Sequence, residues 1–309
     1  MPWPIAARAQ QAAMPVIGFL NSEEPNSYAN RIESFRLGLR QVGFVEGQSV
    51  SIEYRWAESR YERIPVLMAE LIDRRVSVIV VNGPAAYAAK NPTVPVVFFT
   101  GGDPVALGLV KSLNKPGGNV TGTTVLNIEL TAKRVEVLRE ALPKAESFAL
   151  LVNSNNGNAK AVSDQMRLSA RTLGLRDHVL EASDTSALQL AFSRLKQMGV
   201  GGLIIGADGF FTSHSSQLAA LATRHAMPAI FQYRDFVASG GLLSYGANIS
   251  EAYTQIGIYA GRILKGERPA DLPVVQSTKV ELLVNLKAAK ALGIDMPQTL
   301  LARADEVIE

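Results

Sequence analysis

Hydrogen-bonding, acidic and aromatic residues follow the short apolar runs of this chain, and their types could do chemistry. Asparagine and serine supply directional hydrogen bonds, glycine lets a backbone N–H approach a ligand, and aspartate can hold an ammonium group. Aromatic faces can pack against a flat group. Each residue alone could equally be a turn or helix-capping residue. As a set they indicate binding of a small molecule, and the candidates are Asn21, Ser22, Asn82, Gly83, Thr100, Gly101, Asp103, Asn153, Asn155, Asp208, Phe211, Tyr233, Arg234 and Tyr245.

Signatures of catalysis and of metal binding are weak in this sequence. Ser193 and Lys196 match a Ser-x-x-Lys pattern, but they lie inside an expected helix without companion motifs. The chain has no Gly-x-Ser-x-Gly elbow, no P-loop and no Gly-x-Gly-x-x-Gly fingerprint after its first strand. His178, His214 and His225 lack the spacing of metal ligands. We therefore expect no catalytic set, no cofactor and no metal site.

The composition is that of a folded globular protein. The chain has 309 residues, 47% hydrophobic and 19% charged, which is enough for two domains that each bury a core. The formal charge is only +3 and no dense Lys/Arg run is present, which argues against a nucleic-acid partner. The absence of cysteine excludes disulfides and thiol chemistry. The apolar runs are far shorter than the ~20 residues that span a bilayer.

The first 13 residues, MPWPIAARAQQAA, do not read as part of a core. Ala7-Arg8-Ala9 fits the small-x-small pattern that signal peptidase prefers, but the positively charged start and a long apolar segment are missing. The segment is either a flexible N-terminal extension or the C-terminal end of an export signal whose first residues are missing.

Alternating strands and helices would position the candidate residues. From Val16 onward, short β-branched runs alternate with segments of helical period, which predicts an α/β protein with parallel sheets. After a turn-rich stretch at 115–119 the same alternation begins again, so we expect two similar, doubly wound, Rossmann-like lobes. Ligands of such sheets bind beyond the carboxyl ends of the strands, where the candidates lie. The expected strands are 16–20, 49–56, 76–81, 94–100, 148–152, a weaker one around Val179, 203–206, one that ends before Gln232, 242–245 and 279–284.

Five stretches, in this order, closely resemble the tryptophan-type substrate-binding proteins of bacterial ABC importers. They are GLRQVGFVEGQSVSIEY (38–54), LNKPGGNVTG (113–122), GGLLSYG (240–246), GRILKGERPADL (261–272) and LARADEVIE (301–309). The resemblance covers nearly the whole chain. It implies a type I periplasmic binding protein fold, with two lobes joined by a multi-crossover hinge. Residues 1–14 would be a residual signal peptide, 15–122 plus 246–272 lobe 1, and 123–245 plus 273–309 lobe 2.

The resemblance also implies a function without catalysis. The protein would capture a small molecule, an amino acid or an aromatic or carboxylate compound, and deliver it to an inner-membrane permease driven by a separate ATPase. It would be a periplasmic monomer, cleaved after Ala9. For an aromatic amino acid, the expected contacts are Asp208 or Asp103 for the ammonium, Ser22, Thr100 and backbone near Gly101 for the carboxylate, and Tyr233, Phe211 or Tyr245 for the ring.

The chain departs from the family pattern at two places, and two other classes of function remain alternatives. Many relatives resemble Asp-Pro-Phe-Phe where this chain has Asp208-Gly209-Phe210-Phe211, and carry Gly-Gly where it has Asn82-Gly83. A ligand other than the tryptophan type is therefore an alternative. An enzyme on the same scaffold would need Asp208, Arg234 and Asp235 as an acid–base set. A cytoplasmic effector-binding domain of a repressor shares this architecture, but the residues before Val16 do not read as a helix-turn-helix.

Overall fold

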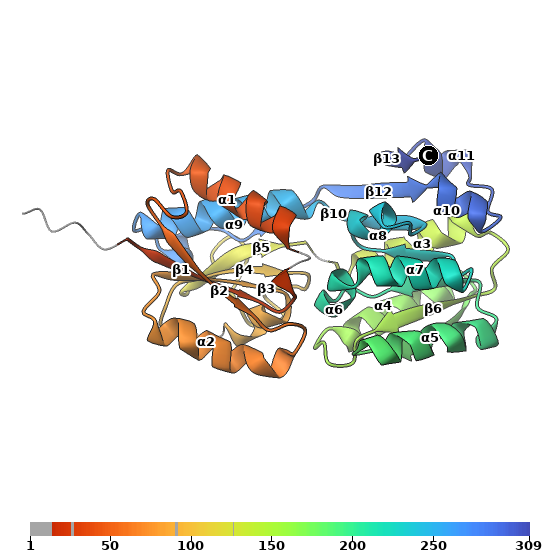
Figure 1. The fold of residues 1–309 in the computed structure, drawn as a ribbon, viewed down its shortest axis with the longest axis horizontal. Helices are drawn as coiled ribbons and strands as arrows, with labels where there is room; N and C mark the ends of the chain where they lie inside the picture. The colour runs from red at the N-terminus through yellow and green to blue at the C-terminus, as the bar shows by residue number, and fades with distance from the viewer. Residues whose placement is uncertain (1–13, 26–27, 90–91, 126) are drawn as a thin grey trace, which may run out of the picture.

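Two α/β lobes lie side by side along the long axis of the molecule in the computed structural model (Figure 1). The structure describes residues 14–25, 28–89, 92–125 and 127–309. The predicted cleavage site after Ala9 lies outside these residues. Each lobe is a sheet with helices on both faces, so the prediction of two doubly wound lobes is confirmed.

The first lobe is built on a six-stranded, all-parallel sheet. Its central strands are β-branched and aromatic runs buried on both faces, as is typical of parallel sheets. In pairing order the strands are β11 (Val275–Gln276), β5 (Val120–Thr124), β4 (Val96–Thr100), β3 (Val78–Asn82), β1 (Val16–Asn21) and β2 (Ser51–Trp56). The helices are α1 (Ala29–Gln41) and α9 (Ile249–Leu264) on one face, α2 (Ile64–Asp73) and η3 (Gly83–Ala88) on the other, and the short η2 (Tyr61–Arg63) and η4 (Pro269–Asp271).

The second lobe repeats this plan with a seven-stranded sheet. Its neighbouring strands are parallel except for the pair β10 and β12, which is antiparallel. In pairing order its strands are β13 (Glu306–Ile308), β12 (Val280–Asn285), β10 (Leu243–Ala247), β9 (Ala229–Phe231), β8 (Gly202–Ile205), β6 (Ser147–Val152) and β7 (Arg176–Glu181). The helices are α3 (Leu130–Ala141), α4 (Ala159–Thr172), α10 (Leu286–Ala291) and α11 (Gln298–Leu301) on one face, and α5 (Thr185–Met198), α6 (Gly209–Ser213), α7 (Ser215–Arg224) and α8 (Arg234–Ala238) on the other.

Strands β5, β11 and β13 were not predicted. Val120–Thr124 reads VTGTT, without the apolar run expected of a buried strand, yet all five residues are buried. Gly122 is required there because a Cβ at this position would lie 2.0 Å from the carbonyl oxygen of Phe98 in β4. β11 and β13 have only two and three residues, too few to show a period in the sequence.

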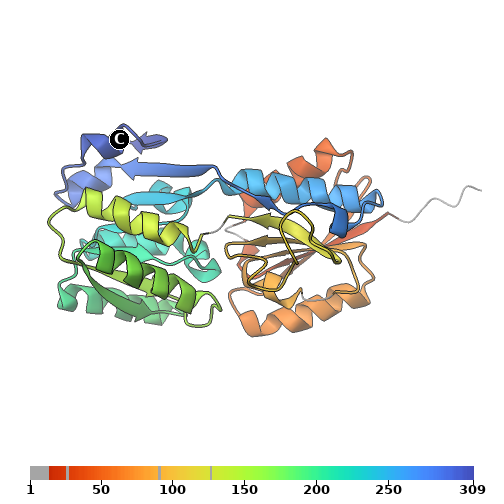
Figure 2. The same cartoon turned by 180° about the vertical axis from the view of Figure 1, so that it is seen from behind.

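The chain crosses between the lobes three times, after Thr124, Ala247 and Gln276 (Figures 1 and 2). The domain boundaries expected from the sequence, at 122, 245 and 272, stay a prediction. Arg134 of α3 has a fully buried side chain. It forms hydrogen bonds to residues at or next to two of these crossings. Its Nε donates to the carbonyl of Tyr245 at 2.8 Å, and its Nη1 and Nη2 donate to the carbonyl (3.1 Å) and Oδ1 (3.2 Å) of Asn127.

Helices α1 and α9 pack with their backbones in contact, because glycines face each other across the pair. A Cβ on Gly38 would lie 1.9 Å from the carbonyl oxygen of Thr254, and one on Gly257 would lie 2.1 Å from that of Phe35. Both obstacles are backbone atoms, which cannot rotate away. Since α9 starts at a lobe crossing, this contact fixes how the hinge leaves the first lobe.

We expect Gly257→Ala to destabilise the protein by about 1–3 kcal/mol, because the added methyl group forces α1 and α9 apart. Thermal unfolding monitored by circular dichroism measures this as a lowered Tm. The matched control is Gly118→Ala, since a Cβ on Gly118 meets no atom within 4 Å. Equal Tm values for the two variants would contradict the proposed packing.

Candidate functional site

A cavity lies between the lobes where the carboxyl ends of the two sheets face each other. Its volume is about 50 Å³ and it is walled by both lobes and by residues of the crossings. The first lobe contributes acidic and aromatic side chains, and the second contributes amide, hydroxyl and carboxylate groups. Among the lining residues are Glu23, Tyr87 and Phe99 from the first lobe, and Asp208, Thr212, Gln232 and Tyr233 from the second.

Asp208, directly after β8, is the most heavily hydrogen-bonded carboxylate of the cavity. Its Oδ1 accepts from Asn153 Nδ2 at 3.1 Å and from the backbone N–H of Phe211 at 3.3 Å, which caps α6. Its Oδ2 accepts from Asn156 Nδ2 at 2.7 Å and from the Tyr61 hydroxyl at 2.9 Å. Because Tyr61 belongs to the first lobe, the last bond joins the two lobes directly.

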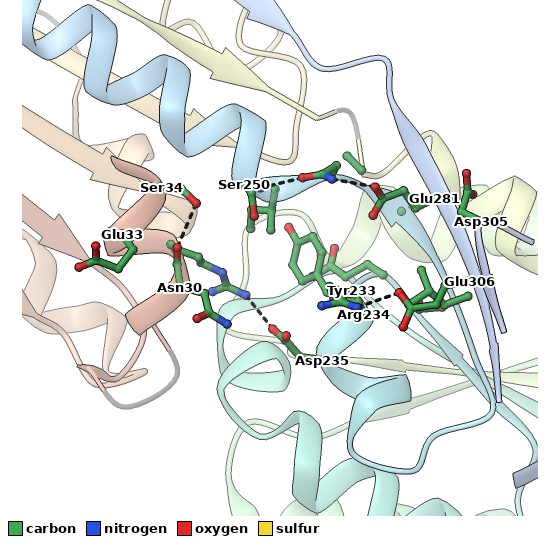
Figure 3. A pocket seen from close by; sticks show the side chains of 18 of the residues that line it. Asn30, Glu33, Ser34, Tyr233, Arg234, Asp235, Ser250, Glu281, Asp305 and Glu306 are labelled. Atoms are coloured by element: carbon green, nitrogen blue, oxygen red, sulfur yellow. Dashed lines mark hydrogen bonds and ion pairs between the residues drawn. The ribbon is translucent and has the colours of Figure 1, made fainter. Parts of the chain in front are cut away.

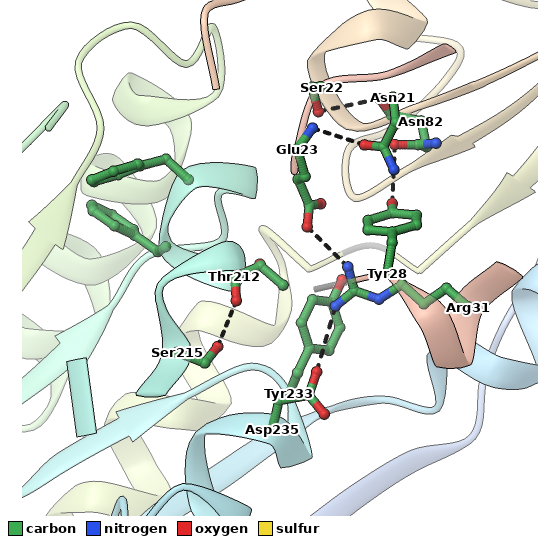
Figure 4. Close-up of polar contacts among 12 residues, drawn as sticks. Asn21, Ser22, Glu23, Tyr28, Arg31, Asn82, Thr212, Ser215, Tyr233 and Asp235 are labelled. Carbon is green, nitrogen blue, oxygen red and sulfur yellow. Dashed lines mark hydrogen bonds and ion pairs between the residues drawn. The ribbon is translucent and has the colours of Figure 1, made fainter. Parts of the chain in front are cut away.

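Glu23 supplies a second carboxylate, from the loop that follows β1 (Figure 4). Its Oε2 accepts from Arg31 Nη1 at 2.9 Å, and its backbone N–H donates to Asn21 Oδ1 at 2.8 Å. Burial raises the pKa of the Glu23 carboxyl to about 7, and the Arg31 charge only partly offsets this effect. The side chain is therefore poised to change protonation near neutral pH.

Arg31 of α1 is buried at the contact between the lobes (Figure 4). Its guanidinium carbon lies 4.6 Å from the ring centroid of Tyr28 in its own lobe and 5.4 Å from that of Tyr233 in the other. The Oδ2 of Asp235, also in the second lobe, is 3.7 Å from Nη2. A single cation thus contacts two residues of the opposite lobe.

Gln232 and Tyr233, which follow β9, leave hydrogen-bonding capacity in the cavity wall. Gln232 is buried and its Nε2 donates to Thr212 Oγ1 at 3.3 Å, whereas its Oε1 has no partner among the described residues. The Tyr233 hydroxyl accepts from Asn127 Nδ2 at 3.1 Å, so its own proton remains available to donate. Asn127 Oδ1 in turn accepts from Arg134, so the buried guanidinium donates to the same side chain that donates to the Tyr233 hydroxyl.

The structure brings four of the predicted residues to the cavity wall: Gly83, Gly101, Asp208 and Tyr233. A second group lies buried next to the wall and supports it: Asn21, Ser22, Asn82, Thr100, Asn153 and Phe211. Asn82 does not reach the cavity, because its Oδ1 accepts from the Tyr28 hydroxyl at 3.0 Å. Asn82 therefore holds the Tyr28 side chain and does not contact a solute in this arrangement.

Four predicted residues do not line the cavity: Asp103, Asn155, Arg234 and Tyr245. The Asp103 carboxylate is exposed and accepts from the backbone N–H of Val105. Arg234 pairs with Glu306 at 2.8 Å, and Tyr245 packs against the core of the second lobe. Asn155 is exposed, whereas its neighbour Asn156 binds Asp208. Asp103, Asn155 and Arg234 thus lie on the surface, and a contact of any of the four with a solute stays a prediction.

Sequence reasoning missed Glu23, Asn127, Asn156 and Gln232 as site residues. Glu23, Asn156 and Gln232 lie within four residues of predicted strand ends, so proximity to those ends was the available signal. Nothing local marks Asn127, which is placed by a lobe crossing. No group of three or more His, Asp or Glu side chains among the described residues is arranged to hold a metal ion. In the described part of the chain, no helix has the length and apolarity to cross a membrane.

Two lobes joined by three crossings, with a polar and aromatic cavity between them, define a class of protein that binds small molecules between its lobes. The chain belongs to the family of ABC transporter substrate-binding proteins, whose model matches residues 17–308. Proteins of this family bind a small-molecule ligand, work with an ABC transporter and are typically extracytoplasmic. A curated relative, a tyrosine-binding protein of Clostridioides difficile, is 27% identical over 282 residues, which cover 90% of this chain and 81% of the relative. The resemblance found in the sequence is thus confirmed.

Solved structures share the two-lobed fold of this chain. A conserved domain protein from Vibrio cholerae superposes with a TM-score of 0.87 at 25% identity, covering 95% of this chain and 99% of that one. An ABC domain from Streptococcus pneumoniae in complex with L-Trp gives 0.86 at 24% identity and the same coverage. The ligand-free, open structure of a substrate-binding protein from Clostridium difficile gives only 0.66, at 26% identity and the same coverage.

Proposed function

We propose that this protein captures an amino acid with an aromatic side chain in the interlobe cavity and delivers it to the permease of an ABC importer. It acts as a periplasmic monomer and makes or breaks no covalent bond. The relatives that bind tyrosine and L-Trp support this choice of solute. The observation that carries the proposal is the buried Gln232 Oε1, which has no hydrogen-bond partner among the described residues, in a cavity that Glu23, Phe99 and Tyr233 also line.

The acceptors on one wall suit the ammonium group of an amino acid. Gln232 Oε1 needs a donor, and a buried acceptor without one costs free energy that a bound ammonium would recover. Glu23 adds negative charge when it is ionised. Asp208 contributes charge at longer range, because both of its oxygens already accept two hydrogen bonds from the protein.

A donor next to Gln232 in the cavity wall suits the carboxylate. The Tyr233 hydroxyl has a proton to donate, and the bonds from Arg134 through Asn127 orient and polarise it. Phe99 and Tyr87 would contact the aromatic ring, since both line the cavity. The Phe99 ring is itself supported by Tyr253, with centroids 5.1 Å apart.

Hinge closure would couple capture to delivery. Tyr61 with Asp208, Tyr87 with Asn158, and Arg31 with Asp235 all join residues of opposite lobes. The cavity, whose volume is about 50 Å³, must widen to hold an aromatic amino acid, which requires these contacts to open; the bound solute then favours the closed form by contacting both lobes. The permease would then recognise the closed form.

Binding of free amino acids tests the proposal. We expect L-tyrosine, L-tryptophan or L-phenylalanine to raise the Tm of the purified protein, because a ligand at ~100 times its Kd stabilises the folded state by about 2.7 kcal/mol. Isothermal titration calorimetry then gives the Kd. A protein that binds sugars or purines and none of the aromatic amino acids would overturn the choice of solute. Recovery of the bound compound chemically altered would show an enzyme.

The residues considered for an acid–base set do not converge. Asp208 lines the interlobe cavity, whereas Arg234 lies outside it and pairs with Glu306. Asp235 also lies outside that wall, beside Arg31. Their separation supports binding without turnover.

Glu23 should make solute affinity depend on pH. Its pKa of about 7 lies above the unfolded value of 4.5, so protonation favours the folded state: the contribution of Glu23 to stability is greatest at low pH and falls as pH rises from 4.5 to 7. Affinity for an ammonium group has the opposite sign, because only the carboxylate attracts it. We expect the Kd for the aromatic amino acid to rise about tenfold from about pH 8 to about pH 6. Calorimetry at both pH values measures this, and Glu23→Gln should remove the dependence; an equal dependence in the variant would contradict the role of Glu23.

A further inference from the structure

A second, larger space adjoins the interlobe cavity on the hinge side (Figure 3). We call it the hinge groove; its volume is about 670 Å³, and it lies between the start of α1, the start of α9, α8 and the strands β12 and β13. Three residues line both spaces: Gln232, Tyr233 and Ile249. These shared residues form the wall between the small cavity and the hinge groove.

Tyr233 is the largest side chain of this wall and is held from two directions. Its hydroxyl accepts from Asn127 Nδ2 at 3.1 Å, and its ring lies 5.4 Å from the Arg31 guanidinium carbon. Only 6% of its surface is exposed. Figure 3 shows the ring in the middle of the view, with Asp235 below it and Glu281 and Glu306 to one side. Because both ends of the side chain have partners, it is a fixed partition in the closed form.

The hinge groove differs from the cavity in its charge. Carboxylates outnumber guanidinium groups along its lining, so a cationic group is favoured there over an anionic one. The charged lining residues are Glu33, Asp235, Glu281, Asp305 and Glu306 against Arg31 and Arg234. A solute that extended past the wall would therefore meet a negative potential.

We propose that Tyr233 sets the maximum length of the solute by closing the cavity against the hinge groove. With Tyr233 in place the protein accepts a free amino acid and excludes the same amino acid extended by a second residue. When the wall is opened, the hinge groove receives the extension and selects a cationic one. This inference rests on the proposed capture of an aromatic amino acid.

The test compares the Kd of L-tyrosine with the Kd values of dipeptides that join tyrosine to lysine or to glutamate, in both orders. In the wild-type protein the dipeptides should bind at least ~100-fold more weakly than L-tyrosine. Tyr233→Ala should lower the ratio of the dipeptide Kd to the L-tyrosine Kd at least tenfold for the lysine dipeptide that binds more tightly. A tenfold change corresponds to about 1.4 kcal/mol. The substitution should lower the ratio less for glutamate dipeptides. The difference between lysine and glutamate should shrink in ~0.5 M salt.

Tyr233→Phe is the matched control, because it removes the hydroxyl but keeps the ring. Its Kd for every solute should rise together, with the ratio unchanged. Ile249→Ala opens the same wall from α9 and serves as the second variant, with folding checked by thermal unfolding. An unchanged ratio in a folded Tyr233→Ala or Ile249→Ala protein that still binds L-tyrosine overturns the role of the wall. A wild-type protein that binds no free aromatic amino acid overturns the proposed function, and this inference with it.

Discussion

Replacing Asp208 with alanine is expected to weaken solute binding on the order of 100-fold and to lower the Tm of the solute-free protein. The carboxylate accepts four hydrogen bonds, from Asn153, Asn156, Tyr61 and the backbone of Phe211. Each buried donor left without an acceptor costs about 1–3 kcal/mol, although such costs do not add fully. The three bonds within the second lobe stabilise that lobe in any state, so their loss lowers the Tm.

The bond from Tyr61 acts differently, because it forms only when the lobes meet. Tyr61→Phe removes this bond, together with the one that the Tyr61 hydroxyl accepts from the backbone N–H of Phe210 at 3.4 Å, and is the matched variant because both bonds join the two lobes. We expect it to raise the Kd about tenfold, since a hydrogen bond to a charged group contributes about 1.5–3 kcal/mol, and to leave the solute-free Tm nearly unchanged. Calorimetry and thermal unfolding of both variants separate the two effects. A Kd for Asp208→Ala within twofold of the wild-type value would show that this carboxylate supports neither the cavity nor closure.

Arg134→Met is expected to destabilise the protein by about 2–4 kcal/mol and to weaken solute binding. Burial lowers the pKa of the Arg134 guanidinium to about 10, which shows that its charge is poorly compensated in the interior. Methionine removes that charge, but it also leaves the carbonyls of Asn127 and Tyr245 and the Asn127 side chain without their donor. The loss of hydrogen bonds should outweigh the gain from removing the charge, because three acceptors lose a charged donor. The residues at two of the lobe crossings also lose the side chain that connects them.

Lys133→Met, one residue earlier on α3, is the control because the Lys133 side chain is partly exposed and, among the described residues, forms an ion pair with Glu136 across one helical turn. Its unfolding free energy, from urea titration, should stay within about 0.5 kcal/mol of the wild-type value. Arg134→Met should also raise the Kd of the solute, since Asn127 then no longer holds the Tyr233 hydroxyl in place. Equal unfolding free energies for Arg134→Met and Lys133→Met would contradict the prediction. They would show that the cost of burying the Arg134 charge equals the stabilisation from its hydrogen bonds.

The fold was predictable because its signals are local. The buried runs at Val78–Asn82 and Val96–Thr100, and the helices that follow the 3.6-residue period, appear in the sequence without reference to the rest of the chain. Strand β5 was missed because its burial depends on neighbours that the sequence does not reveal. Gly38 and Gly257 give no local signal either, since what requires them is the backbone of another helix.

The sequence by itself determined that this is a two-lobed α/β protein of the substrate-binding family, with polar residues at its strand ends. Only the tertiary structure decided which of those residues share a wall: Glu23 and Gln232 were brought to the cavity, and Asp103 and Arg234 were left on other surfaces. The physical reason is that strand ends are set by local hydrophobic period, whereas a binding wall is set by where two lobes and their crossings meet. That meeting depends on contacts such as Arg31 with Tyr233, between residues some two hundred positions apart.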